Sequence, residues 1–408
     1  MLKQQDQNSW QAPVDSLPDL LWDVLVIGAG PAGSMAAIHL ASQGHRTLLL
    51  DKYRFPRDKT CGDGLIPDAI RCLQRAGIYE KVCQAGRQTK MATVFSPSRI
   101  DLEVSGEFLT IKRQILDEIL AREAVSRGAT FCQGKVKSLS LDSQGMITAS
   151  FSDSPQQIRT RIAVIAMGAD VSLLRQLDMV SRPKASGIAI RSYLRSSFHL
   201  DRMIVSFDRA IIPGYAWIFP LANNEYNMGC CLLYRGTSTD QINLKEMFYK
   251  FTAEFPLAQA LLSQGEMITP LQGAMLRCGL TGSQPLKGEK ILAIGESIGA
   301  TFPCTGEGIG KAMETGELAA LVIHKALAKR KSEYLQEFPR LLEEKLKPRY
   351  LGYQIAENWL AKAWLNDFMV QRARKSRFLR EAFTGILAET IDPRMVFSIS
   401  GILKSWWK

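Results

Sequence analysis

The sequence predicts an α/β protein that combines a parallel sheet and its helices with an inserted antiparallel sheet and a C-terminal helical extension. Four short apolar runs end at or just before Gly or Asp, which is typical of buried parallel strands. They lie at residues 23–27, 46–50, 162–166 and 291–294. Between about residues 186 and 285 the pattern changes to β-like runs, and residues 331–408 are helical and basic. Parallel-type segments therefore flank an antiparallel middle, which favours one domain inserted into another.

The elements follow along the chain from local patterns. A helix expected over 34–43 joins the first two strands into a βαβ unit of about 30 residues. Leucine and isoleucine recur at helical spacing over 112–127, which predicts a second helix. The runs 215–220 and 226–233 predict a hairpin, because the turn sequence Ala-Asn-Asn-Glu separates them. A further helix is expected over 306–328.

A glycine-rich loop follows the first strand and opens the first helix, with the sequence Gly28-Ala-Gly30-Pro-Ala-Gly33. Gly28 allows a tight turn, Gly30 lets a pyrophosphate approach the backbone, and Gly33 lets the helix pack on the strand. The free N–H groups at the helix start can bind phosphates. Asp51 ends the second strand, where its carboxylate can bind ribose hydroxyls. The combination predicts a dinucleotide site but does not separate NAD from FAD.

The composition narrows the classes of protein further. The 408 residues are 46% hydrophobic and 22% charged, which excludes disordered, collagen-like and coiled-coil proteins. The net charge of +11 suggests an anionic partner. Eight scattered cysteines and four histidines share no ligand spacing, so we expect no metal site. The N-terminus lacks the apolar core of a signal peptide, which favours a cytoplasmic location.

Four further motifs carry a resemblance to known families. They are Phe55-Pro-Arg-Asp-Lys-Thr-Cys61-Gly-Asp-Gly64-Leu, the aromatic run 215–220 (Tyr-Ala-Trp-Ile-Phe-Pro), Arg113 with Leu116 and Asp117, and Gly295-Glu-Ser-Ile-Gly299 followed by 303–309 (Pro-Cys-Thr-Gly-Glu-Gly-Ile). The Arg113 motif resembles a helix of the wider hydroxylase-like flavoproteins. The other three resemble the geranylgeranyl reductase family of flavoproteins, and its bacterial menaquinone-chain reductases above all. The resemblance implies FAD as cofactor, a glutathione-reductase-type Rossmann domain and reduction of isoprenoid double bonds. The electron donor is left open between NAD(P)H and ferredoxin.

The resemblance also implies which residues contact the cofactor. These are Gly28, Gly30, Ala32, Gly33, Asp51, Lys52, Cys61, Gly62, Arg113, Gly168, Gly295, Glu296, Gly306, Gly308 and Ile309. We expect a tail at 1–20, FAD-binding segments at 21–85, 111–185 and 286–330, substrate-domain segments at 86–110 and 186–285, and a basic helical extension at 331–408.

Two positions depart from the family pattern. Glu296 stands where the family usually has Asp, and its longer side chain could still accept a bond from the flavin ribityl chain. Met167 stands where related hydroxylases have an Asp that serves both FAD and NADPH. Direct use of NADPH therefore has no support in the sequence.

Reduction of an isolated double bond requires a hydride from the flavin and a proton for the other carbon. Cys61 is one candidate donor, because the family places this cysteine near the flavin, and Tyr215 is the second. A cysteine packed under its loop is an equal alternative for Cys61. Trp217, Phe219 and Pro220 are expected to line an apolar prenyl pocket, with ordinary sheet core as the alternative.

The C-terminal segment suggests contact with a membrane surface. Residues 345–408 contain 12 Lys or Arg and five Asp or Glu, a net charge of +7, and four of the seven tryptophans. Aromatic and basic residues together suit an anionic lipid interface, and a lipid-soluble substrate must be collected from a bilayer. A solvated helical face is the alternative. Nucleic acid is not expected, because no binding motif accompanies the charge.

Three functions remain open from the sequence. The first is an FAD-dependent reductase of isoprenoid double bonds. The second is a flavin monooxygenase or halogenase of the same fold, because 215–220 approaches a halogenase motif. The third is a catalytically inactive flavin-binding protein that acts in assembly or sensing, which the changes at Met167 and Glu296 motivate.

Overall fold

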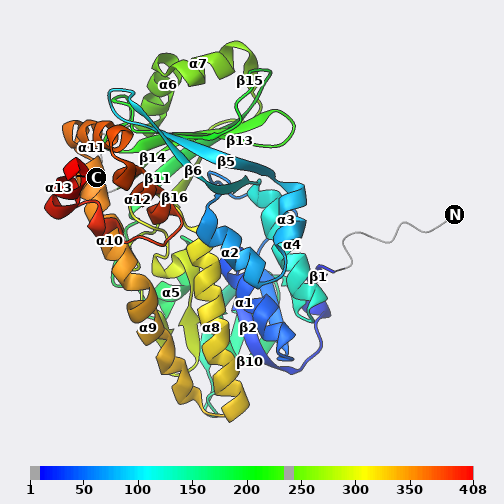
Figure 1. Ribbon diagram of the computed structural model, residues 1–408. Helices are drawn as coiled ribbons and strands as arrows, with labels where there is room; N and C mark the ends of the chain where they lie inside the picture. Colours follow the sequence, from blue (N-terminus) through cyan, green and yellow to red (C-terminus); the bar gives the residue numbers. More distant parts are fainter. Residues whose placement is uncertain (1–9, 234–242, 408) are drawn as a thin grey trace.

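The first of two sheets carries the parallel strands (Figure 1). The computed structural model describes residues 10–233 and 243–407. The strand order is β1 (Ala12–Pro13), β7 (Thr130–Gln133), β3 (Thr47–Asp51), β2 (Leu21–Ile27), β10 (Gln157–Ile165), β18 (Ile291–Ala293) and β17 (Leu286–Lys287). All these neighbours pair parallel except β17 with β18. A hairpin of β8 (Val136–Leu141) and β9 (Ile147–Phe151), which the sequence analysis missed, adds to β10 antiparallel.

The second sheet draws its strands from two separate parts of the chain. Its order is β15 (Gly265–Met267), β11 (Gly187–Ser196), β14 (Glu225–Leu233), β13 (Tyr215–Pro220), β12 (Met203–Ser206), β5 (Arg87–Phe95), β6 (Asp101–Thr110) and β4 (Gly64–Leu65), and β16 (Gln272–Leu276) also pairs with β11. The expected hairpin is present as β13 and β14. The sheet is not wholly antiparallel, because β12 pairs parallel with β5. The chain returns to the first sheet between β6 and β11, which supplies the crossover that a parallel pair needs.

Helices cover both sheets. They are α1 (Pro31–Ser42), α2 (Pro67–Arg75), α3 (Tyr79–Ala85), α4 (Arg113–Ser126), α5 (Ser172–Gln176), α6 (Leu244–Glu254), α7 (Pro256–Ser263) and α8 (Ile309–Lys329). The sequence analysis treated 186–285 as β-like and missed α6 and α7. Phe248, Phe251 and Phe255 follow a helical spacing, and all three are buried in the core against the second sheet.

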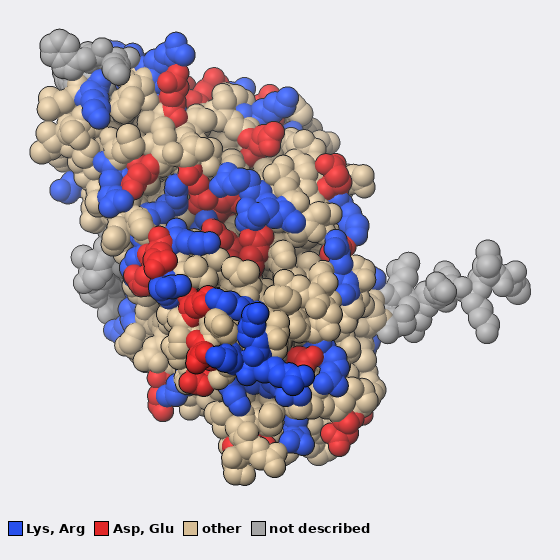
Figure 2. Space-filling model, turned by 60° about the horizontal axis from the view of Figure 1, so that its bottom comes forward, with Lys and Arg blue, Asp and Glu red and all other residues tan. Residues whose placement is uncertain are grey.

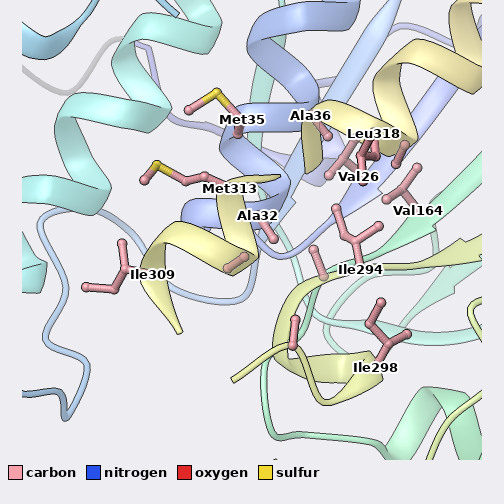
Figure 3. Close-up of a cluster of buried hydrophobic side chains, with 14 of the residues drawn as sticks. Val26, Ala32, Met35, Ala36, Val164, Ile294, Ile298, Ile309, Met313 and Leu318 are labelled. Carbon is pink, nitrogen blue, oxygen red and sulfur yellow. The ribbon is translucent and has the colours of Figure 1, made fainter. Parts of the chain in front are cut away.

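The main core lies where α1 and α8 cross the parallel sheet (Figure 3). Figure 3 shows Ala36 of α1 beside Leu318 of α8, with Val26 and Val164 of the sheet next to them. The two helices approach closely because Gly316 has no side chain: a Cβ there would lie 2.4 Å from the Ala32 carbonyl oxygen. This packing fixes the start of α8 relative to the glycine-rich loop before α1.

The C-terminal extension runs along both halves of the molecule (Figure 1). It consists of η3 (Ser332–Gln336), α9 (Glu337–Leu341), η4 (Leu342–Leu346), α10 (Lys347–Leu360), α11 (Ala363–Lys375), α12 (Arg377–Leu387), η5 (Pro393–Met395) and α13 (Ile399–Trp407). The elements η3 and α9 contact α8, and α11 and α12 contact β6 of the second sheet. In the parts of the chain that the structure describes, no helix is long and apolar enough to cross a membrane.

The segment expected to be a tail is packed from residue 11 onward. Val14 and Leu17 are buried, and β1 forms the edge of the first sheet. The side chain of Gln11 donates to the carbonyl of Phe55 at 2.7 Å and accepts from the Phe55 N–H at 2.6 Å. The prediction of a polar tail is therefore wrong for this part, because two apolar side chains and one amide tie it to the domain.

Candidate functional site

One cavity of about 760 Å³ brings together most of the residues that the sequence analysis selected. The wall includes Gly28, Gly30, Ala32, Asp51, Lys52, Cys61, Gly62, Arg113, Gly168, Tyr215, Trp217, Phe219, Glu296, Gly306, Gly308 and Ile309. Gly33, Gly295 and Pro220 lie outside this wall. A Cβ on Gly33 would lie 1.9 Å from the Gly28 carbonyl oxygen, so this glycine serves the contact between helix and strand, as expected. Pro220 is buried in β13 and accepts a hydrogen bond from Thr110.

The glycine-rich loop has the backbone that the motif requires. Gly28 has a φ of 105°, and a Cβ there would lie 2.3 Å from the carbonyl oxygen of Ala166. At Gly30 the nearest atoms to such a Cβ are side-chain nitrogens of Arg113 and Arg57, at 3.8 and 4.0 Å. The loop is therefore closed on its sheet side and open toward the cavity, where two guanidinium groups lie close to it. That arrangement suits phosphate groups.

Asp51 is held at the end of β3 by three donors. Its carboxylate accepts from the N–H of Ala29 at 3.1 Å and from the N–H of Tyr53 at 3.0 Å. The third donor is Arg57, whose Nη2 lies 3.1 Å from Asp51 Oδ2. These contacts fix the carboxylate at the cavity wall. Lys52, the next residue, is 43% exposed and lies 3.9 Å from Asp170.

A buried ion pair supports the same loop from α4. Arg113 donates from Nε and Nη2 to the two oxygens of Asp117, at 2.7 and 2.8 Å, and Arg57 reaches the same carboxylate at 3.0 Å. Burial alone would lower the pKa of Arg113, but the Asp117 charge outweighs it and raises the pKa. Arg57 links Asp51 to Asp117, a role that the sequence analysis did not assign to it.

The late loop places glycines and the start of α8 against the cavity. Gly306 has a φ of 65°, and a Cβ there would lie 2.6 Å from the Tyr215 hydroxyl oxygen. A Cβ on Gly308 would lie 2.7 Å from Thr301 Oγ1, so neither position accepts a side chain without movement. Ile309 begins α8, whose N-terminus therefore faces the cavity.

Glu296, one of the two departures from the family pattern, is also at the cavity wall. Its Oε1 accepts from the Arg277 N–H at 3.3 Å, and its Oε2 lies 3.5 Å from the Cβ position of Gly168. Met167 lines the cavity beside it. The carboxylate of Glu296 therefore lies between Gly168 and Arg277, the residue that follows β16.

The candidate proton donors and aromatic residues lie between the cofactor loops and the second sheet. Tyr215 donates a hydrogen bond to the Thr305 carbonyl, and burial, with Cys231 nearby, raises the pKa of Tyr215 well above its usual value. Trp217 donates from Nε1 to Asn227 at 2.9 Å, and Asn227 donates to the Cys61 carbonyl at 2.7 Å. This chain fixes the Cys61 loop against β13.

Asp63 is a site residue that the sequence analysis missed. It is fully buried, it has a φ of 62°, and it lines the cavity. Its carboxylate accepts from Tyr193 at 2.6 Å, from Asn227 at 2.8 Å and from the Arg113 N–H at 3.2 Å. Burial raises its pKa to about 6, although the hydrogen bonds from Tyr193 and Asn227 lower it. Asp63 lay within the quoted motif at 55–65, but its partners lie far away in the sequence.

Beyond Trp217 and Phe219 the cavity continues into an apolar end, whose side chains the sequence analysis did not identify. The second sheet contributes Val94, Leu102, Val104, Phe108, Met203 and Val205, and the C-terminal extension contributes Tyr353, Ala356, Leu360, Val370, Phe383, Ile386, Leu387 and Phe397. We call these side chains the apolar end. In α10 three of them recur at 353, 356 and 360, a helical spacing that could have indicated a buried face. The extension therefore forms part of the site.

The residues present fit a dinucleotide cofactor. The glycine-rich loop leaves backbone open to the cavity beside two arginines, Asp51 is fixed where a ribose would lie, and a helix N-terminus closes the other side. The fold and this site define a dinucleotide-binding α/β protein. Residues 22–176 match the FAD binding domain family. FAD, the cofactor that the sequence predicted, is confirmed.

The particular family follows from the relatives. The chain is 30% identical over 315 residues to a menaquinone reductase of Mycobacterium tuberculosis, which covers 73% of this chain and 75% of that one. Among solved structures it resembles a geranylgeranyl bacteriochlorophyll reductase-like protein of Thermoplasma acidophilum, with a TM-score of 0.76, 21% identity and coverage of 95% and 96%. The flavin-dependent brominase Bmp2 also has a TM-score of 0.76, with 18% identity and coverage of 95% and 98%. The two structures show the fold alone.

The chain belongs to the geranylgeranyl reductase family of flavoproteins, as its motifs predicted.

Proposed function

We propose that this protein reduces C=C bonds of a prenyl chain with FAD as cofactor. The observation that carries the proposal is the cavity itself, which joins the cofactor loops to a long apolar end in one space. A prenyl chain needs an apolar wall with few polar groups, and the apolar end supplies one. The printed names of the relatives, menaquinone reductase and digeranylgeranylglycerophospholipid reductase, support the same substrate class.

Several residues would hold the cofactor in this proposal. The loop from Gly28 to Gly33 would bind the phosphates, and Asp51 the ribose. Arg113 would act beside the phosphates, and Glu296 beside the ribityl chain. The late loop from Gly306 to Ile309 would lie against the flavin ring. We also propose that the Rossmann domain is of the glutathione-reductase type. The domain limits are those given from the sequence, except that the first FAD-binding segment begins at residue 11 instead of 21.

The reaction needs one hydride and one proton at adjacent carbons. FAD, when bound and reduced, supplies the hydride. Tyr215 holds its proton at neutral pH, because burial raises its pKa. Cys61 lies at the cavity wall and its loop is fixed by Asn227. Both remain our candidate donors, and Trp217 and Phe219 would line the prenyl site beside them.

The decisive experiment separates the proposed reaction from its alternatives. Bound FAD is reduced by light under anaerobic conditions, and prenyl compounds are then added. Reoxidation of the flavin with a substrate mass gain of two hydrogens is the expected result. A product that requires oxygen and carries oxygen or halogen would show a monooxygenase or halogenase instead. Absence of reoxidation by every substrate and by oxygen would indicate a flavin-binding protein without catalysis.

The role of Cys61 has its own test in the same assay. If Cys61 is the proton donor, a Cys61→Ser variant should reoxidise much more slowly with substrate, because general acid catalysis contributes about 10²–10⁴-fold. Its flavin content should be that of the wild type. Full turnover by the variant would exclude Cys61 as an essential proton donor.

We further propose that the C-terminal extension rests on a membrane surface. In the described part of the extension six large apolar side chains are exposed: Leu351, Ile355, Trp364, Met395, Ile399 and Leu403, by 43, 36, 70, 50, 77 and 57%. The side chains of Trp406 and Trp407 lie outside the described part of the structure. Figure 2 shows basic side chains gathered in a patch in the lower half of one face, with acidic side chains beside it.

Substitution tests this surface better than truncation, because the extension forms a wall of the cavity. A Trp364→Ser and Ile399→Ser double variant should float at least threefold less with vesicles that contain anionic phospholipid. Leu321→Ser is the matched control, because Leu321 is 53% exposed on α8, outside the extension. Equal flotation of wild type and double variant would contradict the proposal.

A further inference from the structure

A buried cluster of charges lies directly under the late loop. Lys311 of α8 is only 2% exposed, and its Nζ lies 3.5 Å from Asp68 of α2 and 2.7 Å from Glu389, which follows α12. Glu314, one turn further along α8, accepts from the same Nζ at 2.5 Å. The cluster thus joins α2, α8 and the C-terminal extension around one lysine.

The carboxyl groups of this cluster outnumber the basic groups. Arg71 and Arg349 lie 2.8 and 3.9 Å from Glu389. Three basic side chains therefore face four carboxyl groups, once Glu307 is included, and ionisation of all four would leave an excess negative charge in a buried site. Such a site binds a proton instead.

Glu307 is the carboxyl group least able to ionise. Its Oε1 accepts from the Gly310 N–H at 2.7 Å, and its Oε2 is buried without a hydrogen-bond partner. Burial, and then the charge of Asp68, raise the pKa of Glu307 well above its usual value. Asp68 Oδ2 is also buried without a hydrogen-bond partner, and burial raises the pKa of Asp68 to about 6 despite Lys311. Because the two carboxyl groups interact electrostatically, ionisation of one disfavours ionisation of the other.

The position of Glu307 connects the cluster to the cavity. Glu307 lies in the cavity wall between Gly306 and Gly308, and the Tyr215 hydroxyl donates to the carbonyl of Thr305, two residues before Glu307. At the other end of the cluster, the Glu314 side chain is 27% exposed. The cluster therefore lies between Glu307 at the cavity wall and the partly exposed Glu314.

We propose that Glu307 stores the proton that prenyl reduction consumes, and that Asp68 and Glu314, which the charged Lys311 holds together, return a proton to it from solvent. This inference rests on the proposed function. In each turnover the O–H bond of Glu307 breaks, its proton forms a C–H bond at one alkene carbon, and the hydride from reduced FAD forms the other. The Glu307 carboxylate then takes a proton from Asp68, which solvent restores through Glu314. Burial alone would lower the pKa of Lys311, but the charges of Asp68, Glu314 and Glu389 outweigh it and raise the pKa, so Lys311 keeps its proton.

The remaining groups that face the cluster do not compete for this proton at neutral pH. From α2 and α10 these are Cys72, Tyr350 and Tyr353, whose pKa values burial raises, so all three stay neutral. Arg71, Arg349 and Glu389 stay in their ion pairs. The exchangeable proton is thereby confined to Glu307, Asp68 and Glu314.

Infrared spectroscopy of the FAD-loaded protein tests the stored proton without any turnover. At pH 7 the wild type should show the C=O stretch of a protonated carboxyl group, and Glu307→Gln should lose it. Glu317→Gln is the matched control on the same helix. Burial would raise the pKa of Glu317, but hydrogen bonds from His39 and Arg75 outweigh it and lower the pKa, so that control should keep the band. An unchanged band in Glu307→Gln would overturn the proposal.

The anaerobic reoxidation assay tests the use of that proton. Glu307→Gln should bind and reduce FAD as the wild type does, yet reoxidise with prenyl substrate at least tenfold more slowly. A wild-type rate would overturn the proposal. Should this variant fail to hold FAD, Glu314→Gln replaces it: a normal first turnover followed by turnovers at least threefold slower supports the return of a proton through Glu314, and unchanged later turnovers reject it. If the wild type reduces no prenyl compound, the proposed function is wrong. The infrared band does not depend on turnover, so it still tests whether Glu307 is protonated.

Discussion

At the cofactor end of the cavity the wall is largely main chain, whereas at the apolar end it consists of side chains from three distant parts of the sequence. Gly28, Gly30, Gly306 and Gly308 present backbone to the cavity, and three of them would clash if they carried a Cβ. The apolar end instead combines strands β5, β6 and β12 with helices α10, α11 and α12. One cavity is therefore bounded by main chain at its cofactor end and by side chains at its apolar end.

The difference determines how each end responds to substitution. A backbone wall cannot move aside without disturbing the strand or helix that carries it, so a single added carbon is costly. A wall of side chains can change volume at one position and keep the fold. We therefore expect cofactor binding to be sensitive to substitution, and substrate choice to be adjustable.

The largest effect should come from Gly28→Ala. The new Cβ would lie 2.3 Å from the Ala166 carbonyl oxygen, at a φ of 105° that alanine rarely adopts. We expect loss of bound FAD and destabilisation of at least about 3 kcal/mol. Flavin absorbance and thermal unfolding measure both. Gly44→Ala is the control, because Gly44 also has a positive φ but nothing within 4 Å, and it should cost only about 1 kcal/mol. Similar losses in the two variants would show that the clash is unimportant.

The second effect concerns the buried ion pair at the same end. Asp117→Asn would leave Arg113 charged and buried without its carboxylate, which should lower the free energy of unfolding by about 3–5 kcal/mol. Denaturant unfolding measures it. Glu118→Gln removes the adjacent, exposed pair with Arg122 and should cost less than about 1 kcal/mol. If the two variants were equally stable, the pair at Arg113 would not support the loop.

The cofactor end could be predicted because its requirements are local. A turn with positive φ followed by a helix start needs glycines at fixed spacing, so Gly28, Gly30 and Gly33 are visible within six residues. Arg57 and Asp63 are also within a quoted motif, yet their functions depend on Asp117 and Tyr193, which no local pattern connects to them. Sequence spacing therefore predicted the positions of the glycine-rich loops, but it did not predict the hydrogen bonds and ion pairs that hold them in place.

The C-terminal extension shows the opposite case. Its charge and tryptophans suggested a surface, and Trp364 is indeed exposed. Charge says nothing about the opposite face of a helix, and that face supplies Tyr353, Ala356 and Phe383 to the cavity. The same limit applies to Ala12–Pro13, whose strand pairing depends on β7.

The third effect is the pH dependence of stability that the buried carboxyl group of Asp63 causes. The pKa of Asp63 is raised from 3.8 to about 6 in the folded protein, so the folded state binds the proton more tightly than the unfolded state. The free energy of unfolding of the wild type should therefore rise, relative to that of Asp63→Asn, as the pH falls from above 6 to below 4. The gain should be about 3 kcal/mol. Urea unfolding at several pH values measures it.

The control for this pH effect shares the backbone conformation but not the burial. Asp178 also has a positive φ, yet its side chain is exposed. The stability difference between wild type and Asp178→Asn should vary less with pH than that for Asp63→Asn. Parallel pH profiles of wild type and Asp63→Asn would refute the assignment of a buried, titrating Asp63.

The smallest effect on stability, and the most specific for substrate, should come from the apolar end. Phe383→Ala enlarges the cavity at a wall position of α12, so it should cost about 1–3 kcal/mol and leave bound FAD unchanged. Because the added volume lies where the prenyl chain would run, the preferred chain length or the KM for prenyl substrate should change severalfold. Phe378→Ala, on the same helix but outside the cavity wall, should leave substrate preference unaltered. Mass analysis of products from a mixture of chain lengths measures the preference. If both variants shifted it equally, or neither did, the side-chain wall of α12 would not select the substrate, and the contrast between the two ends would concern folding alone.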